Sequence, residues 1–134
     1  SAIDECGCGV SIQFYWQDIQ EMYREGFHIG SHTVSHIDCA GEPREKVERE
    51  LVESLADIQS QLGEKDVVLA YPYGGREHMT ADRLQLVRET GYAACLSAYG
   101  GVNFAPVDVF NVLRGGIDCN FSELAFRYRC EGLK

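Results

Sequence analysis

The clearest repeat of apolar positions lies in the middle of the chain, between Pro43 and Gly63. Proline suits the first turn of a helix and glycine suits the position just past its end. Between them, apolar side chains recur at steps of three and four, which places them on one helical face: Val47, Leu51, Leu55, Ile58 and Leu62. This stretch therefore predicts one long amphipathic helix.

Similar signals predict three further helices and four strands. One helix is expected over 14–25 and ends at Gly26, a second runs from Thr80 to Gly91, and a third follows Ser122. Thr80 and Ser122 are residues suited to N-capping. Short apolar runs of strand length lie at 27–31, 67–71, 92–98 and 109–113. Because strands alternate with helices, the pattern predicts an α/β fold with a parallel sheet that is buried on both faces. Without an internal repeat or a low-complexity linker, residues 1–134 are predicted to form a single domain.

Composition and charge narrow the function classes. The chain carries a net charge of −9, so it offers no basic field for nucleic acid or anionic lipid. No apolar run approaches the roughly 20 residues of a membrane-spanning helix. Residues 1–9 have neither the basic flank nor the apolar stretch of a signal peptide. We therefore expect a globular acidic domain that binds no nucleic acid and spans no membrane.

The six cysteines do not form a zinc-type pattern, because no two of them are separated by two residues as in CxxC. Cys95 lies in an apolar run, where a buried thiol behaves as a small hydrophobe. The spacing favours mostly free structural thiols, while the pairing state and the redox compartment stay open.

The loop after the 27–31 strand carries two histidines, His32 and His36, four residues apart. On a helical turn, residues at this spacing project from the same side, and two neutral imidazoles can then reach one metal ion. The alternative is that one histidine packs or caps while the other is solvated.

The loop after the 67–71 strand reads Ala70-Tyr71-Pro72-Tyr73-Gly74-Gly75. Proline restricts φ and the glycines permit positive φ, so the sequence predicts a defined turn that presents backbone groups. A backbone N–H in such a turn is a candidate oxyanion donor. The alternative is an ordinary turn rich in aromatic residues.

Together, the two loops and their order resemble the polysaccharide deacetylases, also called NodB-homology domains or carbohydrate esterase family 4. The resemblance runs from Trp16 to Arg114 and includes Gly30-Ser31-His32-Thr33-Val34-Ser35-His36 and Ala70-Tyr71-Pro72-Tyr73-Gly74. It implies a distorted (β/α)7-type barrel with parallel strands and a hydrolase that removes N-acetyl or O-acetyl groups from a glycan, usually in the cell envelope or outside the cell.

The resemblance also implies roles for single residues. His32 and His36 would be metal ligands, most often for Zn²⁺, and the Tyr73 N–H would face the oxyanion. The side chains of the turn would line the substrate groove: Tyr71, Pro72, Tyr73 and Gly74.

The family's aspartates belong to an Asp-Asp motif after the first strand, and this chain does not match it. Asp4 and Asp18 are poor substitutes, and Asp38 is not a ligand position in the family. We therefore expect an N-terminally incomplete domain whose first strand or strands are missing. Three explanations remain: an upstream segment supplies them, a second chain completes the barrel, or the chain is a degenerate member that binds metal or glycan without hydrolysis. A purely structural α/β domain with coincidental histidines is a further alternative.

Arg114 and Asp118 end a late strand, and they are the candidates to replace the absent polar partners. His78 follows the second loop and is a weaker candidate for the site. His28 lies on the strand that enters the first loop and is expected to pack or to form a hydrogen bond.

Overall fold

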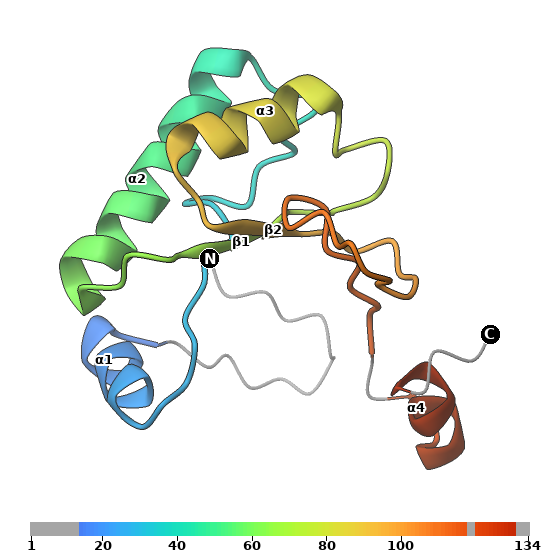
Figure 1. Cartoon of the computed structure of the whole chain (residues 1–134). Coiled ribbons are helices and arrows are strands. Elements are labelled where there is room, and N and C mark those ends of the chain that lie inside the picture. The colour runs from blue at the N-terminus through green and yellow to red at the C-terminus, as the bar shows by residue number, and fades with distance from the viewer. Residues whose placement is uncertain (1–13, 118–119, 131–134) are drawn as a thin grey trace.

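The computed structural model describes residues 14–117 and 120–130, and its helices and strands follow the order expected from the sequence. In chain order they are α1 (Trp16–Arg24), α2 (Arg44–Leu62), β1 (Val68–Ala70), α3 (Ala81–Thr90), β2 (Ala94–Leu96) and α4 (Glu123–Cys130) (Figure 1). No helix in this part of the chain is long and apolar enough to cross a membrane.

Helix α2 confirms the longest sequence prediction. Pro43 precedes its first turn, and Gly63 follows its last with φ 69°, in the left-handed region that ends helices. Four of the five predicted apolar positions are buried together with one serine: Val47, Leu51, Ser54, Leu55 and Ile58. The fifth predicted position, Leu62, is half-buried. The burial of this stripe, rather than helix propensity, stabilises such a helix.

The other helices begin close to their expected residues, with different caps. Thr80 stands at the N-cap of α3, but its hydroxyl donates to the Asp82 carboxylate at 2.6 Å instead of capping the backbone. The Ser122 hydroxyl accepts the Ala125 N–H at 3.2 Å and so caps α4 as predicted.

The sheet is parallel, as predicted. Strand β1 pairs with β2 in the register Leu69 to Cys95, and single bridges add Ser31 beside Leu69 and Val112 beside Leu96. The predicted strands 27–31 and 109–113 are therefore reduced to one bridging residue each. In the first segment, the Phe27 N–H donates to Met22 O at the end of α1. In the second segment, Asp108 accepts hydrogen bonds from Phe110 N and Asn111 N and forms a turn. These local hydrogen bonds limit the strand pairing of both segments.

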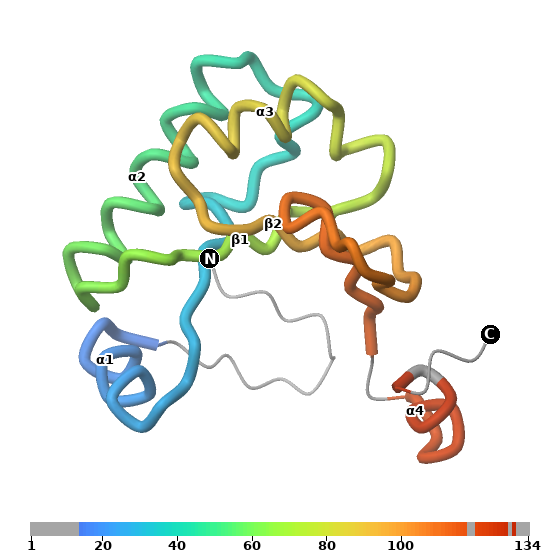
Figure 2. Tube along the Cα trace, in the orientation of Figure 1, coloured from blue at the N-terminus to red at the C-terminus, as the bar shows by residue number. Residues whose placement is uncertain are grey.

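Helices α2 and α3 cover one face of this sheet (Figures 1 and 2). In both strands the central residue is buried and its neighbours are half-buried, so Leu69 and Cys95 face the helices while Val68, Ala70 and Leu96 face the other side. There, a cavity of about 520 Å³ extends from His28 to His32. The prediction of two buried faces thus holds for one face only within the described residues.

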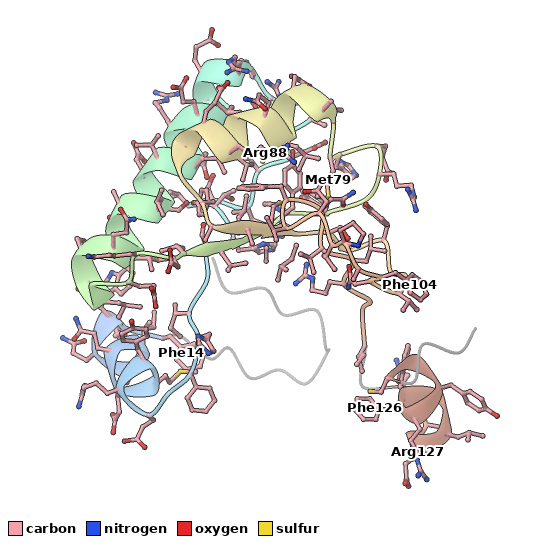
Figure 3. The ribbon with its side chains drawn as sticks, in the orientation of Figure 1. Phe14, Met79, Arg88, Phe104, Phe126 and Arg127 are labelled. Atoms are coloured by element: carbon pink, nitrogen blue, oxygen red, sulfur yellow. The ribbon has the colours of Figure 1, made fainter. Side chains whose placement is uncertain are left out.

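Helix α1 contacts α2, with Tyr23 Oη donating to Glu64 Oε2 at 2.9 Å. Helix α4 makes no contact with another helix or strand of the described residues. Figure 3 shows Phe126 and Arg127 on α4, away from the layer formed by α2 and α3.

Candidate functional site

The carboxyl ends of the parallel segments meet at one edge of the sheet, and each continues into a residue singled out by its sequence. His32 follows the bridge at Ser31, Tyr71 follows β1, and Arg114 comes shortly after the bridge at Val112. Parallel α/β folds place their binding and catalytic groups at this edge. The topology therefore gathers the two candidate loops and the late strand end.

His32 is oriented by the neighbouring strand. Its Nδ1 lies 2.5 Å from the Ala70 carbonyl oxygen. Because a carbonyl oxygen only accepts, Nδ1 carries the proton, and Nε2 keeps its lone pair. This is the arrangement in which an imidazole can bind a metal while a second contact holds the ring in place.

His36 lies beside His32, with ring centroids 4.6 Å apart in an edge-to-face arrangement. The expected helical turn between them is wrong, since residues 32–36 form a loop with φ 63° at Thr33 and φ 55° at His36. The backbone reversal at these residues, rather than helical periodicity, brings the two rings together. The Thr33 hydroxyl accepts the His36 N–H at 3.1 Å and helps to close the loop.

Tyr73 is the third member of this group. Its ring is 56% exposed and lies 4.8 Å from the His36 ring and 5.5 Å from the His78 ring. Its backbone has φ 58°. Within residues 14–117 and 120–130, no acceptor pairs with the Tyr73 N–H.

The rest of the Tyr73 turn is buried, which corrects part of the expected groove. Tyr71 is 1% exposed and its hydroxyl donates to His78 O at 2.9 Å, so its ring cannot form a wall for a sugar. Pro72 is also fully buried. At Gly74, with φ 59°, an added Cβ would lie 2.7 Å from Ala98 N, so only glycine fits between the turn and the residues after β2.

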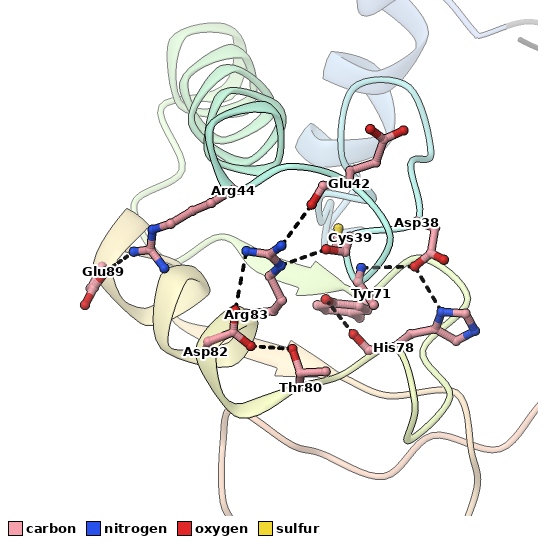
Figure 4. A network of polar contacts seen from close by, with 11 residues as sticks. Asp38, Cys39, Glu42, Arg44, Tyr71, His78, Thr80, Asp82, Arg83 and Glu89 are labelled. Carbon is pink, nitrogen blue, oxygen red and sulfur yellow. Dashed lines mark hydrogen bonds and ion pairs between the residues drawn. The ribbon is translucent and has the colours of Figure 1, made fainter.

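His78 and Asp38 form a pair on the far side of the Tyr73 ring. His78 Nδ1 lies 3.0 Å from Asp38 Oδ1, and this hydrogen bond lowers the pKa of the Asp38 carboxyl. Arg83 holds the same loop by donating to the Cys39 and Glu42 carbonyl oxygens at 2.8 Å each (Figure 4). The sequence named both members, but nothing in their spacing indicated that they pair.

Arg114 and His32 are close enough to interact. The pKa of His32 is lowered, mainly by burial and to a smaller extent by the charges of His36 and Arg114, while the hydrogen bond to Ala70 opposes this shift. Arg114 Nε donates to Ser97 O at 3.0 Å, which anchors its side chain after β2. Asp118, like Asp4, lies outside the described residues, and His28 lines the far end of the cavity beside Glu64 and Asp66.

The two neighbouring imidazoles are not by themselves a full metal-ligand set. Within the described part of the chain no group of three His, Cys, Asp or Glu side chains could hold a metal. Catalytic zinc sites usually have three protein ligands. His32 and His36 are therefore an incomplete ligand set.

The cysteines of this region are structural. Cys39, Cys95 and Cys130 are free, as predicted for this part of the chain. Burial raises the pKa of the Cys39 thiol to about 11 and that of Cys95 to about 12, so both stay protonated near neutral pH. Thiolate binding of a metal is thus disfavoured at both residues.

Family comparison agrees with this arrangement. The model of the polysaccharide deacetylase family matches residues 6–95, which is more than half of the chain. The chain therefore belongs to the polysaccharide deacetylase family. YxkH of Bacillus subtilis (strain 168), whose name places it in the same family, is 22% identical over 118 residues, which cover 88% of this chain and 41% of YxkH.

Solved structures show the same fold at low identity. The deacetylase PplD of Streptococcus pyogenes, in complex with acetate, superposes with a TM-score of 0.77 at 21% identity, over 90% of this chain and 52% of PplD. BC0361, a polysaccharide deacetylase from Bacillus cereus, gives 0.74 at 20% identity, over 90% of this chain and 38% of BC0361. The chain thus spans about half or less of the length of these relatives.

Proposed function

We propose that this chain is part of a metal-dependent hydrolase that removes acetyl groups, N-acetyl or O-acetyl, from a polysaccharide or other glycan. The observation that carries the proposal is the group formed by His32, His36 and Tyr73, in which an exposed and a half-buried imidazole lie beside a residue whose backbone N–H has no acceptor among the described residues. Membership of the polysaccharide deacetylase family supports the same reaction class.

His32 and His36 would hold the ion, Zn²⁺ in this proposal, and the Ala70 contact leaves Nε2 of His32 available for it. Such an ion, when bound, acts as a Lewis acid and makes water a better nucleophile near neutral pH. The Tyr73 N–H would donate to the oxygen that becomes negatively charged as the acetyl carbon turns tetrahedral. The exposed Tyr73 ring offers a flat apolar surface for a sugar face.

Arg114 is a proposed polar partner of the site, because it lies near His32 and is held by Ser97. Asp118, four residues further on, is proposed with it as a residue that replaces an acidic family group. The remaining donors would come from a part of the (β/α)7-type barrel that these residues do not form. Either a further segment of the protein or a second chain would then complete both the barrel and the ligand set.

A second function is favoured by the incomplete donor set. With only two imidazoles gathered in the described residues, the chain could bind a metal or a glycan without hydrolysing it. This binding role needs neither an aspartate ligand nor a base.

One pair of measurements separates these functions. The purified chain is titrated with Zn²⁺ or Co²⁺, and acetate release from acetylated chitooligosaccharides is then followed at saturating metal. Uptake with acetate release supports the hydrolase, and uptake without release supports the binding role for this chain by itself. If the chain takes up neither metal, the metal-dependent proposal is wrong.

A further inference from the structure

Glu50, on helix α2, makes an unusual set of contacts with the loop that carries the two histidines. Its Oε2 accepts the backbone N–H groups of Val34 at 2.9 Å and Ser35 at 2.8 Å. Its Oε1 accepts the Ser35 hydroxyl at 2.6 Å. Every one of these donors belongs to the turn between His32 and His36.

This turn has a backbone that would not persist without support. Thr33 and His36 both have positive φ, at 63° and 55°, and non-glycine residues keep this strained conformation only where the surrounding structure enforces it. Hydrogen bonds to a carboxylate are stronger than those between neutral groups. Glu50 thus supplies the charged contacts that keep the strained turn closed.

The carboxylate is itself held by a rigid element. Glu50 lies between Val47 and Leu51 on α2, and these side chains are 1% and 0% exposed. Because close-packed interiors deform little, the packing of these core side chains, rather than the loop, fixes the position of the Glu50 backbone. Glu50 therefore connects the packed helix α2 to the turn between the two histidines.

We infer that Glu50 is a positioning residue, which sets the spacing of the His32 and His36 imidazoles by clamping the turn between them. This inference rests on the proposed function in so far as the two imidazoles serve as metal ligands. No contact of Glu50 with an ion is implied, because it acts through Val34 and Ser35 alone. Groups that orient metal ligands typically contribute 10- to 100-fold to metal affinity.

The test compares Glu50→Ala with Glu50→Gln in the chain of 134 residues. The alanine variant removes all the acceptors, whereas the glutamine amide keeps one carbonyl oxygen for the two N–H groups, loses the charge and places an NH2 donor beside the Ser35 hydroxyl. Glu53→Ala is the matched control, because Glu53 is an exposed glutamate on the same helix and its loss changes the net charge equally. The readouts are Co²⁺ affinity by titration and hydrogen exchange of the Val34 and Ser35 amides.

We expect Glu50→Ala to weaken Co²⁺ binding by about 10- to 100-fold and to speed exchange at both amides. Glu50→Gln should retain most of the affinity, and Glu53→Ala should match the wild type. Equal affinity and exchange in Glu50→Ala and Glu53→Ala would overturn the inference.

A wild type that binds no Co²⁺ would count against the proposed function and not against the clamp. In that case the ring resonances of His32 and His36 in NMR spectra replace the titration. Resonances that move in Glu50→Ala and stay in Glu53→Ala would support the clamp, and unchanged resonances in both would overturn it.

Discussion

The helix-covered face of the sheet and its carboxyl edge differ in the interactions that hold their residues in place. On the side covered by α2 and α3, apolar side chains interdigitate and several of them are fully buried, including Leu51, Leu69 and Cys95. At the carboxyl edge, His32 and Tyr73 are exposed and their loops are held mainly by hydrogen bonds. Stability and candidate chemistry therefore come from different parts of the same small unit.

Backbone strain follows the same division. The non-glycine residues with positive φ in the described residues all lie in the two loops of the candidate site: Thr33, His36 and Tyr73. Strained conformations persist only where the surrounding structure enforces them. The covered side of the sheet thus supplies the rigidity on which the strained edge depends.

The largest expected effect comes from a core substitution on α2. Leu51→Ala removes a fully buried side chain and should lower the free energy of unfolding by about 2–5 kcal/mol. Val52→Ala on the same helix is the control, because Val52 is 48% exposed and its loss should change stability by less than about 0.5 kcal/mol. Urea unfolding measures both, and similar losses would contradict the division between a packed and an open side.

The converse effect is expected at the edge. His36→Asn removes an imidazole, while asparagine tolerates the positive φ of this position. Metal affinity should fall by at least about 100-fold, and the free energy of unfolding should change by less than about 0.5 kcal/mol. Calorimetric titration with Zn²⁺ gives the affinity. His28→Ala is the matched control, and if it weakens binding as much as His36→Asn does, the assignment of His36 as a ligand is wrong.

An intermediate effect is expected where the edge meets the core. Gly74→Ala would bring a Cβ within 2.7 Å of Ala98 N at a positive φ, and should destabilise the turn by about 1–3 kcal/mol. Gly75→Ala meets only the flexible Glu77 side chain and should cost much less. Thermal unfolding compares the two, and an equal cost would show that the close approach to Ala98 does not constrain the turn.

The smallest effect concerns acid stability. Desolvation raises the pKa of Glu50, but the hydrogen bonds from Ser35 and Val34 outweigh it, so the folded-state pKa lies below its ordinary value of 4.5. The folded state then favours the ionised form, which stabilises the protein above pH 4.5 and ceases to do so as the pH falls through the lower folded pKa. Glu50→Gln should therefore flatten the fall in unfolding free energy below about pH 4.5, and an unchanged slope would contradict this assignment.

Much of the fold was predictable from the sequence. The apolar repeat from Val47 to Leu62, with Pro43 and Gly63 at its ends, predicted α2 within a residue or two. The parallel order of β1 and β2 followed from the alternation of strands and helices. The strand ends at 27–31 and 109–113 were predicted too long, because their pairing is limited by local turns that apolar pattern does not reveal.

The candidate site was predicted in its members and less well in its geometry. His32, His36 and Tyr73 do meet, but through positive-φ turns instead of a helical turn, and Tyr71 points into the core. Glu50 was missed, although an acidic residue between Val47 and Leu51, at the border of an apolar face, was a signal that it contacts something. The Asp38–His78 pair joins residues 40 positions apart, a separation that no local pattern reports.

The sequence by itself determined the family and the helices, and it named the candidate residues of the site, because periodicity, capping residues and short motifs are local properties. Only the tertiary structure decided which tyrosine is exposed, how the histidine turn is held and that Arg114 approaches His32. These three features depend on which strand ends lie next to each other and on how side chains pack between α2 and the sheet. Contacts between residues far apart in the chain determine both the strand order and this packing.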